Sequence, residues 1–310
     1  MTSDAVVREL RRTSRKLVRE LGVVGGRHPA VGCTLTEGHV LLELDDAGSL
    51  TVGELAERLA LDKSTTSRAV AALARRRLVT HRANRSDRRR KQCVLTANGR
   101  KQVTRIHEEA DQRVHDALEL LGDDEPERIL TASLRYARAL SNARRARGYR
   151  LRAIARSDNA ELLTLIREVR DEHRHIVGAD APLDEPDEHD LARLYSRPRS
   201  HFVVIESANG LVGGGGFSPL AGGHGDTCEL QRMYFRPEIR GLGLGFRLLR
   251  RCLDKASDFG FEQCYAETMA GMDRANALYS KAGFEPLDKP LGATGHTFTD
   301  AWLVKRLRPA

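Results

Sequence analysis

The sequence has no apolar run long enough to cross a membrane and few of the features of an exported protein. No uninterrupted apolar run approaches the roughly 18 to 20 residues of a membrane span. The N-terminus carries Asp4, Glu9 and the arginines Arg8, Arg11 and Arg12 without an apolar core, so it does not resemble a signal peptide. Five cysteines form no CxxC pair, and their odd number argues against a disulfide framework. We therefore expect a cytoplasmic chain with reduced thiols.

Two common nucleotide motifs and a metal site are also missing. The glycine-rich stretch 240–245 is not followed by the Lys-Ser or Lys-Thr of a P-loop. Phe246 occupies the position where the dinucleotide motif GxGxxG would need its third glycine. His173, His175 and His189 have no Cys or Glu partner at a ligand spacing, so we expect no bound metal.

Charge divides the chain into two halves. Residues 1–150 carry 30 Lys and Arg against 20 Asp and Glu, a net +10, and residues 151–310 carry 21 against 23, a net −2. A basic half beside a near-neutral one suggests that the first half binds a polyanion and that the second half acts on a small molecule. A chain of 310 residues has room for two domains with their own cores. We place the boundary in the basic stretch 142–150, which gives domains 1–148 and 149–310.

The first half contains two short helices joined by a tight turn. Thr51 caps a predicted helix that ends at residue 59, and a three-residue turn leads to a second helix over residues 63 to about 77. Val70 and Leu73 lie on the inward stripe of this second helix, together with Thr66. Its other face opens with short polar and cationic side chains, the types that read base edges in the major groove. The candidate DNA contacts are Lys63, Ser64, Thr65, Thr66 and Arg68. An ordinary solvated helix face is the alternative.

A strongly basic loop follows the second helix. Strands are predicted over residues 78–80 and 92–95, and the segment from Arg75 to Lys91 holds nine cations and one acid. Such a loop repels itself unless it is solvated or neutralised by phosphates, and a hairpin beside a recognition helix is the wing of a winged helix-turn-helix. Residues 5–145 resemble the MarR family of transcription regulators, whose wing carries Asp-x-Arg, matched here by Asp87-Arg88-Arg89. The resemblance implies that Arg89 or a neighbour enters the minor groove of double-stranded DNA while Asp87 braces the loop.

Helices predicted over residues 5–21, 103–121 and from residue 123 onwards carry more apolar surface than the DNA-reading part needs. In the MarR family, terminal helices form a dimer, so the resemblance implies a homodimer. A long helix packed within its own domain is the alternative.

In the second half, one predicted strand contains a slip in its apolar pattern. Two apolar runs around Asn209-Gly210 predict a hairpin, and four glycines (213–216) in its second strand suggest close passage of a ligand or another backbone. In the next strand, 228–235, the first apolar residues occupy even-numbered positions and the last occupy odd-numbered positions, so a regular strand would place them on opposite faces. We expect a bulge near Arg232, which would expose backbone N–H groups.

The glycine-rich stretch joins this strand directly to an amphipathic helix that ends near Gly260. Such a turn points unpaired N–H groups at a phosphate. The pattern Arg240-x-x-Gly243-x-Gly245 resembles the pyrophosphate motif of the GNAT superfamily of N-acetyltransferases, and residues 229–234 and 276–284 are similar to further GNAT signatures. The predicted fold is therefore multidomain: a mainly α winged helix-turn-helix domain, then an α/β (α+β) GNAT domain with a mixed, largely antiparallel sheet.

The GNAT resemblance implies acetyl-CoA as cosubstrate and an amine as acceptor. The implied coenzyme contacts are Met233, Tyr234, Phe235, Arg240, Gly241, Leu242, Gly243, Leu244, Gly245, Asn276 and Tyr279. It also implies that Tyr279 is the general acid for the departing thiolate. An alkyl ammonium must lose a proton before it attacks, so a carboxylate is needed. Glu229 is the candidate, with Glu267 or water in reserve, and an ordinary strand acid is the alternative.

We expect a transcription regulator joined to an acetyl-CoA-dependent N-acetyltransferase. Two alternatives stay open. The GNAT domain could sense acetyl-CoA or a small ligand without turnover, or the basic domain could bind a protein or RNA.

Overall fold

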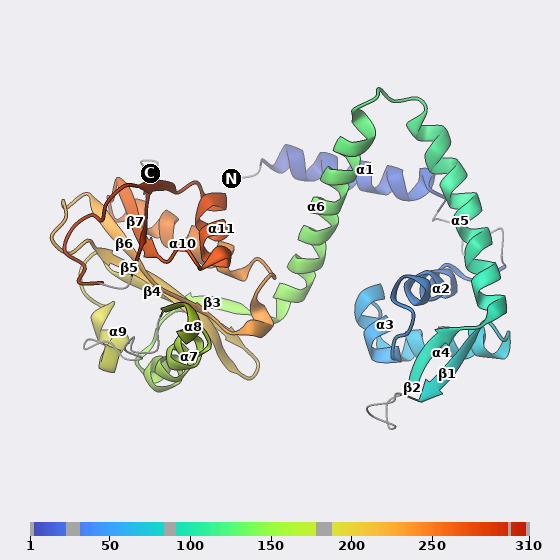
Figure 1. Cartoon of the computed structure of the whole chain (residues 1–310), viewed down its shortest axis with the longest axis horizontal. Coiled ribbons are helices and arrows are strands. Elements are labelled where there is room, and N and C mark those ends of the chain that lie inside the picture. The colour runs from blue at the N-terminus through green and yellow to red at the C-terminus, as the bar shows by residue number, and fades with distance from the viewer. Residues whose placement is uncertain (1–2, 23–31, 84–90, 178–187, 297–298, 308–310) are drawn as a thin grey trace. The chain divides into compact units, whose positions relative to one another are not determined.

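A computed structural model describes residues 3–22, 32–83, 91–177, 188–296 and 299–307 (Figure 1). The chain divides into two compact units, Met1–Leu130 and Thr131–Ala310, and each is described by itself. The domain boundary proposed between residues 148 and 149 lies further along the chain and stays a prediction.

The first unit is mainly helical. Its elements are α1 (Asp4–Glu20), α2 (Leu35–Ala47), α3 (Val52–Leu59), α4 (Lys63–Arg75), β1 (Val79–Ala83), β2 (Lys91–Leu95) and α5 (Ala97–Leu118). A capping box starts α3: Thr51 Oγ1 accepts from the Glu54 N–H at 3.2 Å, and Glu54 Oε2 accepts from the Thr51 N–H at 2.7 Å. Ala60, with φ 56°, turns the chain toward α4. The predicted helix–turn–helix is present.

A small hairpin completes this unit. Strands β1 and β2 pair antiparallel from Val79 with Leu95 to Ala83 with Lys91. The buried core beneath them includes Leu41, Leu55 and Leu73, one each from α2, α3 and α4. Three helices packed on a two-stranded hairpin form a winged helix. Helix α6 (Glu125–Arg145) begins in the first unit and ends in the second.

The second unit is built on one seven-stranded sheet. Its strands are β3 (Arg150–Ala153), β4 (His201–Ser207), β5 (Gly210–Pro219), β6 (Thr227–Phe235), β7 (Gln263–Thr268), β8 (Glu285–Leu287) and β9 (Ala301–Arg306). The order is β3-β4-β5-β6-β7-β9-β8, and every neighbouring pair is antiparallel except β6 with β7. The predicted mixed, largely antiparallel sheet is confirmed.

Helices cover both faces of this sheet (Figure 1). On one side lie α10 (Leu244–Asp258) and α11 (Asp273–Ala282), and on the other lie α7 (Asn159–Glu172), α8 (Arg174–Val177) and α9 (Leu191–Leu194). Along β4, Val203 and Ile205 belong to the α10 core while Phe202 and Val204 belong to the α7 core. Because strand side chains alternate, a strand buried on both faces is apolar at successive positions.

The four glycines of β5 lie where neighbouring groups leave no room for a side chain. A Cβ on Gly213 would lie 2.7 Å from a ring carbon of Phe235, and a Cβ on Gly214 would lie 2.7 Å from a ring carbon of Phe202. A Cβ on Gly216 would press on the His201 carbonyl oxygen. These glycines therefore let rings and backbone pack close against the centre of the sheet, as the sequence predicted.

Candidate functional site

A β-bulge interrupts the central strand β6. Gly214 pairs with Tyr234 and Gly216 pairs with Gln231, so two residues of β6 face the single glycine between them on β5. Arg232, the first of the two, has φ 55°, a region that residues other than glycine rarely adopt. The predicted slip near Arg232 is confirmed.

Just before the bulge, β6 separates from β7. Their pairing runs from Thr227 with Gln263 to Leu230 with Ala266, while β6 itself continues to Phe235. Beyond Leu230, the described part of β7 offers no strand pairing to β6. Peptide groups on that edge of β6 can therefore bind a ligand.

The glycine turn lies directly after this strand. It follows a short 3-10 turn (Pro237–Ile239), and φ is 77° at Gly241 and 80° at Gly243. A Cβ on either glycine would meet no atom within 4 Å, so the positive φ requires glycine and the space beside the backbone is open. Helix α10 begins at the next residue, Leu244. Unpaired N–H groups of its first turn thus lie beside open space at the positive end of the helix dipole.

Several predicted coenzyme contacts have side chains in the core. Leu242 is 5% exposed and Leu244 is 0% exposed, and Met233 and Phe235 pack against the same core. Tyr234 packs on the opposite face, with the α7 core. At these positions, contact with a ligand therefore falls to the backbone.

Arg240 is anchored on three sides. Its Nε donates to the Phe235 carbonyl at 2.8 Å, and its two terminal nitrogens donate to the two Glu172 carboxylate oxygens at 2.5 and 2.7 Å. These hydrogen bonds hold the pKa of Glu172 below its ordinary value. The guanidinium braces the glycine turn against α7, so a phosphate that contacts it must share it with Glu172.

The last turns of α6 also reach the glycine turn. Asn142 Nδ2 donates to the Gly241 carbonyl at 2.8 Å. Ala146, just after α6, is 2% exposed within the α10 core. The end of α6 is therefore part of the second unit's fold.

The register of β6 and β7 places two carboxylates on one face. Glu229 lies opposite Tyr265, and Glu267 follows two residues later on β7, so all three side chains face the same way. Both carboxylates have side chains that are 4% exposed. His296 Nδ1 lies 3.5 Å from Glu229 Oε1 and 3.1 Å from Glu267 Oε2.

The two carboxylates differ in their pKa. Burial raises the pKa of Glu229, against smaller opposing effects of the Gln231 hydrogen bond and of His296. Burial also acts on Glu267, but its hydrogen bonds outweigh it and leave the pKa of Glu267 below the ordinary value. The donors to Glu267 are Tyr265 Oη at 2.8 Å, Thr294 Oγ1 at 2.9 Å, Thr299 Oγ1 at 3.0 Å and His296 Nδ1 at 3.1 Å. Glu229 is thus the carboxylate suited to exchange a proton, while Glu267 stays ionised.

A chain of hydrogen bonds links Glu229 to Arg232. Gln231 Nε2 donates to Glu229 Oε2 at 2.7 Å, Tyr195 Oη donates to Gln231 Oε1 at 2.8 Å, and Arg232 Nη1 donates to Tyr195 Oη at 3.0 Å. Ser218 Oγ also donates to Gln231 Oε1, at 3.2 Å. Because two hydroxyls hold the amide oxygen, the amide nitrogen faces Glu229 and orients its carboxylate.

Helix α11 carries the predicted residues Asn276 and Tyr279. Asn276 Nδ2 donates to the carbonyls of Met269 and Ala270 at 3.0 and 3.1 Å, which holds the loop after β7. Tyr279 is 6% exposed, with its ring centroid 5.5 Å from that of Phe284. Burial raises the pKa of Tyr279, so its hydroxyl keeps its proton at neutral pH.

Sequence reasoning did not assign a site role to four residues of this network: Tyr195, Gln231, Arg232 and His296. Gln231 could have been found, because it lies two residues after Glu229 and strand side chains repeat every second residue. No local pattern marks Tyr195 or His296, which reach the cluster from distant parts of the chain.

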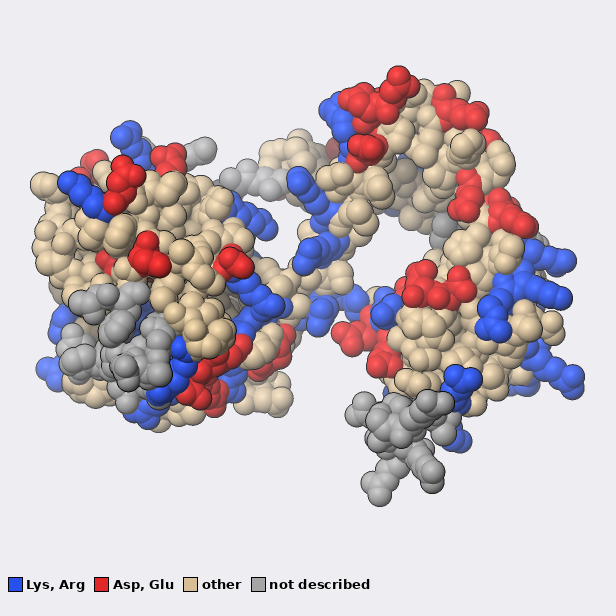
Figure 2. Space-filling view, viewed as in Figure 1, with Lys and Arg blue, Asp and Glu red and all other residues tan. Residues whose placement is uncertain are grey.

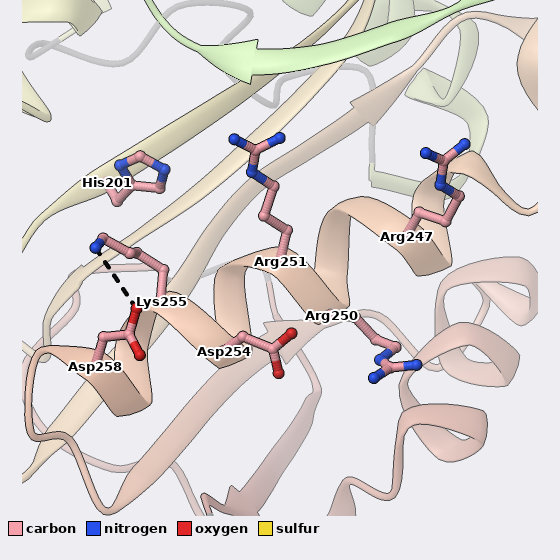
Figure 3. A pocket seen from close by; sticks show the side chains of 7 residues that line it. All are labelled: His201, Arg247, Arg250, Arg251, Asp254, Lys255 and Asp258. Atoms are coloured by element: carbon pink, nitrogen blue, oxygen red, sulfur yellow. Dashed lines mark ion pairs between the residues drawn. The ribbon is translucent and has the colours of Figure 1, made fainter. Parts of the chain in front are cut away.

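A separate cavity of about 520 Å³ lies along α10 beside β4 (Figure 3). Its lining residues are His201, Arg247, Arg250, Arg251, Asp254, Lys255 and Asp258. Figure 3 shows Arg247 and Arg251 pointing toward the strands, where Arg251 Nη1 donates to the Leu151 carbonyl at 2.9 Å. Lys255 Nζ lies 3.6 Å from Asp258. None of the predicted site residues lines this cavity, and we assign it no catalytic role.

In the first unit, the start of α4 is organised by its N-cap, Asp62. Ser64 Oγ and the Thr65 N–H donate to Asp62 Oδ1 at 2.6 and 2.7 Å, and Thr65 Oγ1 donates to Oδ2 at 2.7 Å. These hydrogen bonds, led by that from Ser64, lower the pKa of Asp62. Arg68 Nη2 donates to Thr65 Oγ1 at 3.1 Å, so a hydrogen-bonded row extends over the first turn.

The structure divides the predicted DNA contacts of α4 into two groups. Lys63, Ser64 and Arg68 are exposed and Thr65 is half-buried. Thr66 is 0% exposed, and its hydroxyl donates to the Asp62 carbonyl at 3.0 Å. Including Thr66 among the DNA contacts was therefore wrong, because its side chain lies in the core. The wing residues Asp87, Arg88 and Arg89 lie outside the described residues.

Figure 2 shows Lys and Arg grouped over the first half of α5, and acidic residues gathered at the turn between α5 and α6.

Neither α1 nor α6 has a buried residue. Their exposed apolar side chains are Val6, Val7, Leu10, Leu17 and Val18 on α1, with Leu21 at its C-cap, and Ile129, Leu130, Leu134, Tyr136 and Leu140 on α6.

A winged helix followed by a mixed sheet whose central strands part is the architecture of a DNA-binding regulator fused to an acyltransferase. A model described as the acetyltransferase (GNAT) family matches residues 163–284, and a model described as the MarR family matches residues 31–90. The uncharacterized N-acetyltransferase YjgM of Escherichia coli (strain K12) is 38% identical over 157 residues, which cover 51% of this chain and 94% of that protein.

Solved structures also match the chain. An acetyltransferase of the GNAT family from Staphylococcus aureus is 19% identical with a TM-score of 0.46, covering 52% of this chain and 99% of that one. The PaiA N-acetyltransferase of Thermoplasma acidophilum, solved in complex with coenzyme A, is 17% identical with a TM-score of 0.43, covering 51% and 98%. The chain belongs to the GNAT family of acetyltransferases and carries a MarR-family domain in its first half. Both predicted families are confirmed.

Within the described ranges, no helix combines the length and the apolar character needed to cross a membrane. The same ranges contain no group of three or more His, Cys, Asp and Glu side chains that could hold a metal ion.

Proposed function

We propose that the second unit transfers an acetyl group from acetyl-CoA to an amine, and that the first unit binds double-stranded DNA as a homodimer. One observation carries the acetyl transfer: Glu229, a buried carboxylate with a raised pKa, lies on the strand that bulges at Arg232 and leads into the open glycine turn. The chain thus passes in order from the proposed base to the edge of β6 that is not paired with β7, and then to the glycine turn that would bind phosphate.

The residues present fit a coenzyme with a pyrophosphate. The open space beside Gly241 and Gly243 admits phosphate oxygens close to the backbone N–H groups at the start of α10. When bound, acetyl-CoA supplies an acetyl thioester. The parted edge of β6 would hold its extended arm and donate N–H groups to the acetyl carbonyl oxygen, where negative charge develops.

The side chains then account for the protons. Glu229 would take one from the acceptor ammonium, directly or through a water, so that the neutral nitrogen forms the new C–N bond. As the C–S bond breaks, Tyr279 would give its proton to the thiolate. The hydrogen-bond chain through Gln231 would keep Glu229 oriented, and ionised Glu267 would hold His296 beside it.

Replacing Tyr279 with phenylalanine is expected to lower kcat about tenfold or more, because the thiolate then leaves without its general acid. Coenzyme binding should be kept, since the substitution removes only the hydroxyl of a ring packed against Phe284. Steady-state rates give kcat and calorimetry gives coenzyme affinity. Unchanged turnover would remove Tyr279 from the mechanism.

The proposal is tested by incubating the full chain with acetyl-CoA and a panel of amines while free thiol is measured. Thiol release that depends on the amine supports acetyl transfer. Tight coenzyme binding without thiol release across the panel would favour the alternative, a domain that senses acetyl-CoA. The buried Glu229 with a raised pKa favours turnover, because sensing needs no proton acceptor.

For the first unit, the exposed start of α4 supports DNA binding. Lys63, Ser64 and Arg68 present cations and a hydroxyl on the face away from the core, and the segment from Arg75 to Lys91 adds nine cations. This pattern suits a recognition helix in the major groove beside a basic wing.

Homodimer formation is supported by the uncovered apolar side chains of α1 and α6. Substituting glutamate for Leu134, which is 61% exposed, is expected to yield monomers, because a buried unpaired charge costs several kcal/mol (about 3–5) at an interface. Sedimentation velocity would measure the mass. Ala139→Glu is the matched control, because it places the same charge on another side of α6, in a row with Arg128 and Arg135. A monomeric native chain would contradict the homodimer.

A further inference from the structure

Arg232 brings a cation to the face that holds the carboxylate pair. Its guanidinium reaches Tyr195 Oη at 3.0 Å, and Tyr195, which is 4% exposed, packs in the α7 core. Three hydrogen bonds and the Gln231 side chain connect Arg232 to Glu229. The face therefore presents a buried carboxyl group and a half-buried cation at the two ends of one hydrogen-bonded chain.

The bulge is what places Arg232 there. On the N-terminal side of the bulge, Gln231 lies on the same face of the sheet as Glu229. On its C-terminal side, Tyr234 packs with the α7 core on that same face. A regular strand would give this face only every second residue, whereas the extra residue adds the Arg232 side chain between them. Arg232 adopts φ 55° to do so, and such strain persists where the surrounding structure holds it, often at ligand sites.

We propose that the acetyl acceptor is an amine that also carries a carboxylate, with Arg232 binding the carboxylate while Glu229 receives the amine proton. A planar guanidinium with several donors matches a carboxylate in geometry and charge. An acceptor with one ammonium and one carboxylate complements both Glu229 and Arg232. This inference rests on the proposed acetyl transfer.

The test compares each amino acid with its own amide as acceptor, in the full chain, with free thiol as readout. The series includes α-amino acids and longer ω-amino acids, because the spacing between amine and carboxylate is the variable that the site selects. For the preferred spacing, kcat/KM for the acid is expected to exceed that for the amide about tenfold or more, since a charged hydrogen-bonded pair is lost in the amide.

Two variants assign the discrimination to Arg232. Arg232→Gln is expected to raise KM for the acid about tenfold and to bring the acid-to-amide ratio of kcat/KM close to one, a ratio in which any loss shared by both acceptors cancels. Arg232→Lys keeps the charge and should restore part of the preference. Arg236→Gln is the matched control: this nearby arginine is paired with Glu168 at 3.0 Å, so the acid-to-amide ratio should stay as in the wild type.

The outcomes separate the two proposals. No thiol release with any amine overturns acetyl transfer itself. Thiol release in which acids and amides react equally, or in which amines without a carboxylate react best, overturns only the carboxylate-bearing acceptor. An acid preference that survives Arg232→Gln unchanged also overturns it, because another group must then bind the carboxylate.

Discussion

Replacing Glu229 with glutamine is expected to lower kcat about 100-fold or more, because the acceptor ammonium loses its proton acceptor. Burial raises the pKa of Glu229, and only its ionised form is a base. In the wild type, kcat should therefore rise as pH increases through this raised pKa. In the variant that limb of the pH profile should be missing, and rates with a saturating amine from pH 5 to 9 would show it.

Folding stability provides the control for this substitution. The folded-state pKa of Glu229 lies above its unfolded value, so its contribution to stability is present below the unfolded pKa and is lost as pH rises through the folded pKa. Glutamine does not ionise, so at alkaline pH the variant should unfold at the same temperature as the wild type or higher.

Glu267→Gln is the matched comparison on the neighbouring strand. The pKa of Glu267 is lowered in the folded state, so its stabilising contribution is present above the unfolded pKa and is lost as pH falls. That variant should lose stability at neutral pH while keeping the pH-dependent limb of kcat. If instead Glu267→Gln removes the limb and Glu229→Gln keeps it, the roles of the two carboxylates are reversed.

Replacing Arg68 with alanine is expected to weaken DNA binding about 10- to 100-fold. Arg68 is exposed on α4 beside Thr65, and a base-edge contact by arginine is worth about 1–3 kcal/mol. If Arg68 contacts a phosphate instead, affinity should fall uniformly across sequences and the salt slope should decrease by about one. Titration of DNA selected from a random pool, at several salt concentrations, distinguishes the two modes.

Arg58→Ala is the control for this experiment. Arg58 lies on α3 and is paired with Glu43 at 3.1 Å, so removing it takes a cation from the same unit without touching α4. Equal losses for the two variants would show that net charge alone drives binding, and no loss for Arg68→Ala would exclude the start of α4 as the DNA-reading surface.

Local sequence patterns predicted much of this architecture. The helix cap at Thr51, the turn into α4 and the bulge at Arg232 each depend on residues a few positions apart, and such spacings reflect the repeats of helix and strand. Thr66 shows where the same reasoning failed. The helical spacing already placed it on the inward stripe, and burial in the structure decided against its use as a DNA contact.

By itself, the sequence determined the two families, the order of the units and the glycine turn, because these depend on contiguous motifs. Only the tertiary structure decided how the acid–base groups differ. Glu229 and Glu267 look alike in the sequence, but Gln231, Tyr195 and His296 meet them from separate segments. The pKa of a carboxylate depends on its burial and on the donors that surround it, and those donors come together only when distant parts of the chain fold onto one sheet face.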